Sequence, residues 1–333
     1  MSDFFIAVDL GGTNLRIAAV NEQGKLMEKI SLSAKVARDP RSVIADMCGA
    51  ITRLQEKYRG TSSLHGIGVG MPGVYDQRTG RIHEAPNLPG WDKYPVKAEI
   101  ETQLGTQVTL ENDGNVAALG EKWLGAARGL DDMAILTLGT GVGGGLVFGG
   151  RIWRGVWGAA GELGHIPVEP EGVPCGCGNR GCLEQYASAT AVVRMAREAI
   201  AAGRAPELAR VGASDAEFGA KAVYELAMQG NPEAGEIFQT VGRALGIALG
   251  MFVNILNLPM YVVGGGLAGA WDAFAPTMFK ELRYRALAFA AVAQPEEEAG
   301  AIGRGQTVVT RAQLGSDAGL YGAAYLAMMT RAG

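Results

Sequence analysis

The chain has 333 residues, of which 48% are hydrophobic and 19% are charged, with a formal net charge of −4. This composition excludes an intrinsically disordered chain, and the length predicts two domains. No run of Lys or Arg exceeds two residues, so no nucleic-acid-binding surface is expected. The only dense charged run, PEEEAG (295–300), is typical of a solvated loop.

The chain begins with MSDFFIAVDL, which predicts a strand and shows no basic leader sequence. No window reaches the ~18 apolar residues that indicate a membrane span. Three of the four cysteines lie within eight residues of one another, a spacing typical of a metal site in a reducing compartment. We therefore expect a cytoplasmic protein without a membrane partner.

The N-terminal part predicts strands that alternate with helices. A buried strand (4–9), a glycine turn (10–14) and a returning strand (15–20) form a hairpin. Apolar residues at helical spacing predict a helix over 42–58. The later elements are a strand with a Pro-Gly turn over 66–73, a helix over about 93–104, a strand over 107–113 and a helix from about Asn115 to Gly125.

The pattern then restarts, with a strand (134–138), a glycine turn (139–145) and a returning strand (146–148). Two units of strand, glycine turn and strand indicate an internal duplication. The remaining elements are helices over 189–202, 215–229 and 232–257, a strand over 260–263 and a helical tail over 316–331. This alternation predicts an α/β fold.

The first glycine turn, DLGGTN (9–14), has the features of a phosphate site. Gly11 and Gly12 would present backbone N–H groups to an anion, and Thr13 adds a hydroxyl donor. Asp9 could hold Mg²⁺ through water. The alternative is an ordinary glycine hairpin.

Two further glycine clusters follow strands. The turn within TLGTGVGGG (137–145) offers Gly139, Thr140 and Gly141, and the cluster within VGGGL (263–267) could lie flat against a nucleoside. Each cluster alone is common, and none matches the P-loop or dinucleotide spacing. Three clusters at strand ends are better explained by a bound nucleotide. The residues of the last cluster are Gly264, Gly265 and Gly266.

The segment ENDGN (111–115) follows a strand and supplies a candidate general base. The carboxylate of Asp113 can accept the proton of an attacking hydroxyl, with Asn112 and Asn115 orienting it. The alternative role for Asp113 is to cap the following helix.

The sequence also predicts a zinc site. His165, Cys175, Cys177 and Cys182 provide four ligands, enough for a closed tetrahedral and therefore structural Zn²⁺. The alternative of three unpaired thiols in one loop is disfavoured because exposed thiols oxidise. Glu162 and Glu184 bracket this loop, and two carboxylates with an imidazole suit the hydroxyls of a sugar.

Other singular residues are assigned as follows. Cys48 fits the buried face of its helix, whereas His65 and His83 have no companions in the sequence and are expected at the surface. Trp91, in PNLPGW (86–91), is either a platform for sugar stacking or a packed anchor of its loop. Asn87 in the same segment is a candidate sugar contact.

Together these motifs resemble the ROK family (repressors, open reading frames, kinases), and within it the bacterial ATP-dependent glucokinases. The resemblance spans nearly the whole chain and rests on DLGGTN, ENDGN, GELGH (161–165), CGCGNRGC (175–182), EQYAS (184–188) and LGSDAGLYGAAYLA (314–327). It implies an actin/hexokinase-like fold of two α/β lobes with a cleft between them, and a homodimer or homotetramer. It also implies Asp113 as base, sugar contacts from Asn112, Glu162, His165 and Glu184, and zinc at His165, Cys175, Cys177 and Cys182.

We expect a small lobe (1–118 with 316–333) and a large lobe (119–315). The predicted reaction is ATP-dependent phosphorylation of a hexose at its 6-hydroxyl, with glucose preferred, and sugar binding should close the lobes. N-acetylglucosamine, N-acetylmannosamine or fructose are alternative sugars, and polyphosphate is an alternative donor. A sugar-responsive repressor is disfavoured because Asp9 already lies in the phosphate motif, which leaves no room for an N-terminal helix-turn-helix. An actin-like ATPase would need neither ENDGN nor the cysteine loop.

Overall fold

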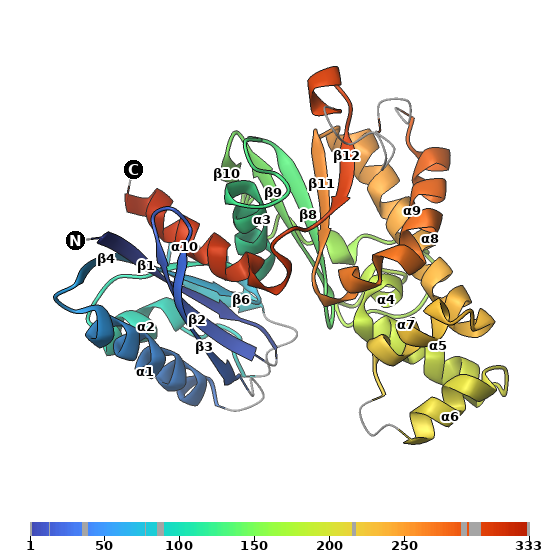
Figure 1. The fold of residues 1–333 in the computed structure, drawn as a ribbon, viewed down its shortest axis with the longest axis horizontal. Helices are drawn as coiled ribbons and strands as arrows, with labels where there is room; N and C mark the ends of the chain where they lie inside the picture. The colour runs from blue at the N-terminus through green and yellow to red at the C-terminus, as the bar shows by residue number, and fades with distance from the viewer. Residues whose placement is uncertain are drawn as a thin grey trace. The chain divides into compact units, whose positions relative to one another are not determined.

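The computed structural model describes residues 2–12, 14–34, 39–76, 78–84, 90–214, 218–287, 292 and 301–331 (Figure 1). The chain divides into two compact units, the first made of residues 1–135, 144–161 and 313–333 and the second of residues 136–143 and 162–312. The predicted lobe boundary at 118/119 falls inside helix α3 (Asp113–Trp123), and the lobe bounds stay a prediction.

The first sheet has the order β3-β2-β1-β4-β7. Its strands are β1 (Ser2–Leu10), β2 (Asn14–Asn21), β3 (Leu26–Ser33), β4 (Ser62–Met71) and β7 (Thr109–Asn112). The β1–β2 and β2–β3 pairs are antiparallel, and the β1–β4 and β4–β7 pairs are parallel. A small second hairpin consists of β5 (Val74–Asp76) and β6 (Arg81–Glu84). The predicted hairpin of β1 and β2 is therefore present.

The other five-stranded sheet has the order β10-β9-β8-β11-β12. Its strands are β8 (Met133–Leu138), β9 (Val142–Phe148), β10 (Arg151–Ile152), β11 (Met260–Gly264) and β12 (Val308–Arg311). As in the first sheet, the outer hairpin strands β10 and β9 pair antiparallel, and the strands at the opposite edge, β11 and β12, pair parallel. The matching order of the two sheets agrees with the predicted internal duplication.

Alternation along β1 gives the first sheet two buried faces. Phe4, Ile6 and Val8 belong to a core that includes α1 (Pro40–Tyr58) and α2 (Val96–Leu104). Phe5 and Ala7 point to the other face, toward α3 and α10 (Ala318–Arg331). Because successive side chains of a strand point to opposite sides, one buried strand serves both cores.

Helices α3 and α10 approach each other closely at glycines. A Cβ at Gly322 would lie 1.5 Å from the carbonyl oxygen of Val116, and a Cβ at Gly120 would lie 2.1 Å from that of Ala318. A Cβ at Gly68 on β4 would lie 1.9 Å from the carbonyl oxygen of Ala323. These glycines are needed for backbone packing, since real Cβ atoms do not approach that closely.

The second unit is mainly helical, and its strands include β11 and β12. Its helices are α4 (Glu184–Ala187), α5 (Ala189–Ala201), α6 (Pro206–Ser214), α7 (Ala220–Met228), α8 (Pro232–Leu256) and α9 (Trp271–Arg285). Among the described residues α8 alone is long and apolar enough to cross a membrane, whereas the sequence predicted no such segment. However, 61% of its most apolar window is buried inside the protein, mainly against α9, so its apolarity serves the core.

The predicted elements differ from the structure in several places, and strands β3, β5, β6, β10 and β12 and helix α4 were not predicted. The helix predicted over 215–229 is α7 with a later start, and α6 precedes it; residues 215–217 lie outside the described part. The second glycine turn is shorter than predicted, because β9 begins at Val142 and includes Gly143, Gly144 and Gly145. Helix α9, with Pro276 in its interior, was not predicted.

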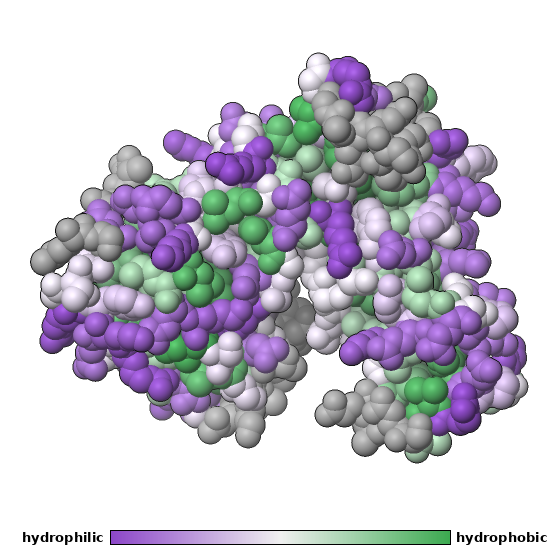
Figure 2. All heavy atoms as spheres, viewed as in Figure 1, coloured by the Kyte–Doolittle hydropathy of each residue, from purple (hydrophilic) through white to green (hydrophobic). Residues whose placement is uncertain are grey.

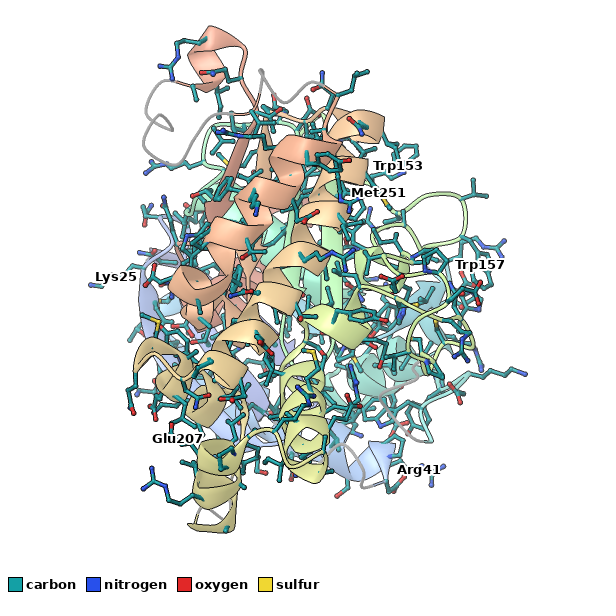
Figure 3. The ribbon with its side chains drawn as sticks, turned by 90° about the vertical axis from the view of Figure 1, so that its right-hand side faces the viewer. Lys25, Arg41, Trp153, Trp157, Glu207 and Met251 are labelled. Carbon is teal, nitrogen blue, oxygen red and sulfur yellow. The ribbon has the colours of Figure 1, made fainter. Side chains whose placement is uncertain are left out.

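Hydrophilic side chains cover much of the face shown in Figure 2, and hydrophobic ones form small separate groups on it. The large exposed hydrophobic side chains include Trp153 and Trp157, which lie at the surface in Figure 3. Such residues occur singly on most proteins, so only a cluster of them indicates a function.

Candidate active site

The first glycine turn joins β1 to β2. The N–H of Gly11 donates to the carbonyl oxygen of Asn14 at 2.8 Å, so this group closes the turn and is not available to a phosphate, contrary to the prediction. A Cβ at Gly12 would meet nothing within 4 Å, which leaves open space beside that backbone. Thr13 lies outside the described residues. Gly12 is thus the described residue of this turn best placed to approach a ligand.

Asp9, at the end of β1, is buried and ion-paired. Nη2 of Arg16 donates to its Oδ2, and Nη1 of Arg16 lies 3.7 Å from Oδ1 of Asp317. Burial raises the pKa of Asp9, although the Arg16 charge opposes the shift. Gly319 packs directly against the Asp9 carboxylate, because a Cβ at Gly319 would lie 2.7 Å from it. Arg16 takes one oxygen of the Asp9 carboxylate, and the water-mediated magnesium contact that the sequence suggests stays a prediction.

The second glycine turn, residues 139–141, is held by its neighbours. The N–H of Gly139 donates to the carbonyl oxygen of Gly141 at 2.9 Å, and Thr190 Oγ1 donates to the carbonyl oxygen of Thr140 at 2.7 Å. Glu184 Oε2 accepts the N–H of Val142 at 3.0 Å, and a Cβ at Gly141 would lie 2.2 Å from the same oxygen. The turn predicted to bind phosphate therefore contacts a carboxylate predicted to bind sugar.

The glycines at 143–145, predicted to be part of this turn, have a packing function instead. A Cβ at Gly145 would lie 2.7 Å from the carbonyl oxygen of Gly114, and a Cβ at Gly114 would lie 2.3 Å from that of Gly144. Strand β9 thus passes directly against the first turn of α3. This close approach explains the glycines without a ligand.

The third glycine cluster follows β11. Gly264 ends that strand, and Gly265 has a φ of +84° and would place a Cβ 2.4 Å from the carbonyl oxygen of Leu138. Gly266 begins a short 3₁₀ helix, η2 (Gly266–Ala270), and a Cβ there would meet nothing within 4 Å. Backbone packing on β8 requires Gly265, whereas Gly266 leaves open space for a ligand.

Asp113 is the first residue of α3, and Asn112 is its N-cap. Asn112 Oδ1 accepts the N–H groups of Gly114 (2.8 Å) and Asn115 (3.2 Å), and its Nδ2 donates to the carbonyl oxygen of Gly73 at 3.2 Å. The capping role considered for Asp113 therefore belongs to Asn112. One N–H of Asn112 remains for a sugar hydroxyl, and Asp113 Oδ1 accepts the N–H of Gly114 at 2.9 Å.

Asn115 does not orient Asp113 as predicted. It is buried, and its Nδ2 donates to Oε1 of Glu111 at 3.0 Å. Glu111, with only 1% of its side chain exposed, was missed as a functional residue. The sequence signal was present, because an acidic residue predicted inside a buried strand needs partners.

The four predicted zinc ligands come together. The donor atoms of His165, Cys175, Cys177 and Cys182 all lie within 4.8 Å of one another. The Cys177 and Cys182 Sγ atoms are 3.7 Å apart, and Cys175 Sγ is 3.7 Å from His165 Nδ1. Thiolates around zinc at the ~2.3 Å bond length lie about 3.8 Å apart in a tetrahedron, so the donor set and its spacing fit Zn²⁺.

The fold of the cysteine loop depends on a glycine. Gly181 has a φ of +68°, and a Cβ there would lie 1.6 Å from the carbonyl oxygen of Glu169. The N–H groups of Val168 and Glu169 both donate to the carbonyl oxygen of Gly181. This contact brings Cys182 back to the segment that follows His165.

His165 and the two carboxylates are neighbours in the second unit. Nδ1 of His165 faces Cys175, whereas Nε2 lies 4.0 Å from Oε2 of Glu162. Burial raises the pKa of Glu162, with the charge of His165 opposing and that of Glu184 reinforcing the shift. A metal on Nδ1 would leave the Nε2 proton as a donor on the side of Glu162.

Several other predictions have definite outcomes. Trp91 is 0% exposed and packs in the core beside Tyr94, which excludes the sugar-stacking platform and supports the anchor role. His65 and His83 are half-buried and do have companions, namely Asp3 at 2.6 Å and the stacked ring of Trp157. Cys48 is buried as predicted. Asn87 lies outside the described residues.

Comparison with known proteins decides the family. The model of the ROK family matches residues 5–330. The chain belongs to the ROK family. It is 37% identical to a glucokinase of Halalkalibacterium halodurans over 98% of this chain and 96% of the relative, and 36% identical to a glucokinase of Thermotoga maritima over 92% and 97%. A solved ROK glucokinase from Streptomyces griseus, in complex with glucose and AMPPNP, superposes with a TM-score of 0.81 at 32% identity, covering 98% and 99% of the two chains.

These similarities confirm the actin/hexokinase-like α/β fold and the kinase assignment of this ROK chain. They do not test individual residues, so the assignments of Asp113, Glu162 and the zinc ligands remain predictions that rest on the geometry above.

Proposed function

We propose that this ROK protein is an ATP-dependent glucokinase that transfers the γ-phosphoryl group of ATP to the 6-hydroxyl of glucose. The observation that carries the proposal is the near full-length similarity to glucokinases, combined with a carboxylate, Asp113, held at the first turn of a capped helix. Asn112 of the first unit and Glu162, His165 and Glu184 of the second would contact the sugar hydroxyls. Asn87 is also proposed as a sugar contact.

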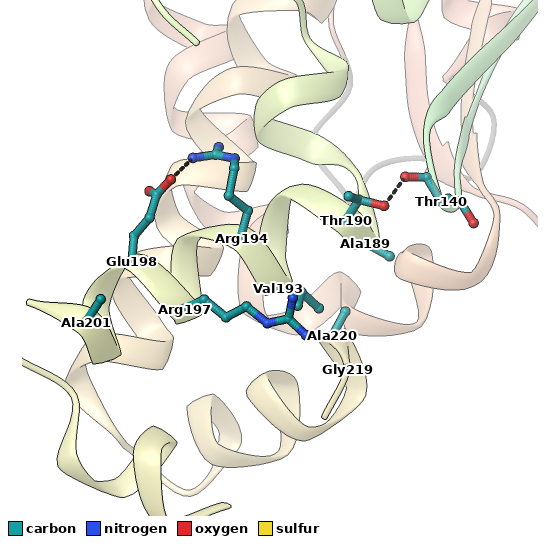
Figure 4. A pocket seen from close by; sticks show the side chains of 10 residues that line it. All are labelled: Thr140, Ala189, Thr190, Val193, Arg194, Arg197, Glu198, Ala201, Gly219 and Ala220. Carbon is teal, nitrogen blue, oxygen red and sulfur yellow. Dashed lines mark hydrogen bonds and ion pairs between the residues drawn. The ribbon is translucent and has the colours of Figure 1, made fainter. Parts of the chain in front are cut away.

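The nucleotide would use the glycine turns and a pocket beside the second one. That pocket, of about 610 Å³, is lined by Thr140, by Gly219 and Ala220 at the start of α7, and by a face of α5 that carries both apolar and charged side chains (Figure 4). Arg194 turns toward Glu198 and donates to it at 2.7 Å, whereas Arg197 extends along the pocket. An apolar pocket with a cationic side chain next to a phosphate turn suits a nucleoside. Gly264 and Gly266, with the open space beside Gly12, are also proposed to approach the nucleotide.

The transfer itself would be in-line. Asp113 accepts the proton of the 6-hydroxyl as that oxygen bonds to the γ-phosphorus, and the bond to the bridging oxygen of ADP breaks. Backbone N–H groups near Gly12 and Gly141 offset the charge that develops on the phosphoryl oxygens. The nucleotide's Mg²⁺ would supply further charge neutralisation, with Asp9 reaching it through water.

His165, Cys175, Cys177 and Cys182 would hold zinc, which fixes the ring plane of His165. The two carboxylates, Glu162 and Glu184, would then accept hydrogen bonds from hydroxyls of the sugar. A homodimer or homotetramer and a cytoplasmic location remain expectations from the family resemblance.

A hexose panel tests the proposal. ADP release should be measured with glucose, N-acetylglucosamine, N-acetylmannosamine and fructose, using ATP or polyphosphate as donor. We expect glucose with ATP to give the highest kcat/KM, and Asp113→Asn to lower kcat by ~10²-fold or more while glucose still binds. A preference for an N-acetylated sugar would replace glucose, and a near-normal kcat in folded Asp113→Asn protein would remove Asp113 as the base.

A further inference from the structure

Glu111 is a buried carboxylate whose two oxygens hold different parts of the first unit. Oε1 accepts the backbone N–H of Asn112 at 2.9 Å and Nδ2 of Asn115 at 3.0 Å. Oε2 accepts Nε of Arg154 at 2.6 Å, and Nη2 of Arg154 lies 2.6 Å from the same oxygen. Such complete pairing is needed because an unpaired charge in this position would be very costly.

The first arm of this network fixes the start of α3. Glu111 accepts the backbone N–H of Asn112, the residue before Asp113, and the side-chain amide of Asn115, two residues after it. Asn112 in turn caps the same helix turn. Asp113 and Glu111 are also close enough to Tyr75 that their charges, after burial, raise its pKa well above the ordinary value. The backbone that carries Asp113 is therefore held by Glu111 from both sides.

The second arm reaches the segment that leads to Glu162. The carbonyl oxygen of Arg154 accepts the N–H of Ala160 at 3.2 Å. This hydrogen bond closes a loop over residues 154–160, which we call the 154–160 loop. Gly158 rests on the β5 strand, where a Cβ would come 2.6 Å from the carbonyl oxygen of Tyr75. The ring of Trp157 stacks on His83 with centroids 5.3 Å apart.

This loop needs an anchor, because its own side chains gain little from burial. Trp157 is 59% exposed and Val156 is fully exposed. Figure 3 shows Trp157 at the surface. The Arg154 side chain, 34% exposed, is the part of the loop that enters the protein as an ion pair. Glu162 follows two residues after Ala160, the residue at which the loop closes.

We infer that Glu111 and Arg154 are a pair of positioning residues that ties the 154–160 loop to the helix turn carrying Asp113. The pair sets the placement of the base and, through the loop, that of the segment entering Glu162. This inference rests on the function proposed above. It assigns roles to two side chains that the proposed sugar and nucleotide contacts do not include.

The kinetic test removes one charge at a time. Arg154→Met keeps the length of the side chain but loses the ion pair, and Arg151→Met, at an exposed residue three positions earlier, is the matched control. We expect Arg154→Met to lower kcat/KM for glucose by ~10-fold to ~100-fold, the scale of a small misplacement of reacting groups, with the KM for ATP unchanged. Arg154→Lys should recover part of the loss, and Arg151→Met should behave as the wild type.

The second variant tests whether the two residues act together. Glu111→Gln should lower kcat/KM for glucose, and the double variant Glu111→Gln/Arg154→Met should be no worse than Arg154→Met alone. Wild-type constants for Arg154→Met would overturn the inference. So would losses that multiply in the double variant, or a lower melting temperature with unchanged kinetic constants per folded molecule.

A readout without activity separates this inference from the proposed function. Hydrogen exchange measured by mass spectrometry should show faster exchange at 112–116 and 154–160 in Arg154→Met, with the second unit unchanged. If the wild type phosphorylates no hexose, the proposed function fails. The exchange result would still show whether Arg154 and Glu111 connect the 154–160 loop to the start of α3. Unchanged exchange in both segments would overturn the inferred connection of the 154–160 loop to α3, even in an active glucokinase.

Discussion

At the level of single residues, Gly12 and Gly141 are not equivalent, although both belong to predicted phosphate turns. A Cβ at Gly12 meets nothing within 4 Å, whereas one at Gly141 lies 2.2 Å from Glu184 Oε2. We therefore expect Gly12→Val to raise the KM for ATP by roughly tenfold, equivalent to about 1.4 kcal/mol of binding, and to leave the KM for glucose unchanged. Gly141→Val should raise both constants because it displaces Glu184.

Steady-state kinetics with each substrate varied in turn would distinguish the two glycines. Gly149 also has open space at its Cβ, but its φ of +54° makes it unsuitable as a control. Gly235→Val, at a half-buried position of α8 where a Cβ meets nothing, serves better. An effect of Gly12→Val confined to glucose would show that the first turn does not bind the nucleotide.

The orientation of His165 gives the second residue-scale prediction. With Nδ1 toward Cys175 and Nε2 toward Glu162, the ring can join the metal to the sugar. Cys177→Ser should lower the zinc content from one equivalent per chain and raise the KM for glucose, with little change in the KM for ATP. Metal analysis and kinetics measure both effects.

Cys48 provides the control for that experiment. Burial, with the charge of Glu99 added, raises the pKa of its thiol to about 11, so it stays protonated and is a poor metal ligand. Cys48→Ala should keep the zinc. Full glucose affinity in zinc-free, folded Cys177→Ser protein would refute the connecting role of His165 but not the metal site.

At the level of elements, the contact of α3 with α10 depends on the absence of side chains. Gly322→Ala places a methyl group 1.5 Å from the carbonyl oxygen of Val116, which only a shift of a helix can relieve. We expect a loss of about 1–3 kcal/mol or more in the free energy of unfolding, measured in urea. Gly235→Ala, with open space at its Cβ in α8, should instead stabilise by about 0.5–1 kcal/mol. Equal stabilities would contradict this account of the packing.

Elements with a clear local signal were predictable from the sequence. The β1–β2 hairpin, α1 and α8 follow from alternation, helical spacing and flanking glycines. Helix α9 was missed because Pro276 lies inside it, and proline is usually read as the end of a helix. The glycines of β9 were read as a turn because their reason, the approach of α3, is a contact distant in sequence.

The same distinction applies to the site. The candidate zinc ligands and the candidate base Asp113 could be proposed because each residue type is tied to one chemistry at a short spacing, and the structure brings the four candidate ligands together. The partners of Glu111 and Asn115, and the contact of Glu184 with the second turn, could not be found because they depend on tertiary contacts. The burial of Trp91 has the same origin, since a tryptophan in a Pro-Gly segment gives no sign of which side it faces.

At the level of the whole molecule, the duplicated sheet explains why there are two glycine turns. Each sheet places one turn between the first two strands of its unit of sequence, after β1 and after β8. The later insertions differ: helices α4–α8 with the cysteine loop follow β10, whereas α1 is the helix described between β3 and β4. The duplication accounts for two glycine turns, and the second half also carries Glu162, His165 and Glu184, three of the residues proposed to bind sugar.

The proposed sugar contacts are divided between the compact units, and this leads to the last prediction. Asn112 and Asp113 belong to the first unit, whereas Glu162, His165 and Glu184 belong to the second. Because the proposed sugar contacts come from both units, we expect glucose binding to favour a closed arrangement that excludes water. Small-angle X-ray scattering should show a smaller radius of gyration with glucose, toward the ~20 Å of a compact chain of this length.

Matched variants make that measurement specific. Asp113→Asn should still contract with glucose, because it removes the base but keeps a polar side chain of the same shape. Glu162→Gln should contract only at much higher glucose, since a charge-assisted hydrogen bond to the sugar is weakened. Calorimetry on the same samples establishes that glucose is bound. Bound glucose with unchanged scattering would mean that one unit holds the sugar alone, and either Asn112 and Asp113 or the three residues of the second unit would lose their assignment.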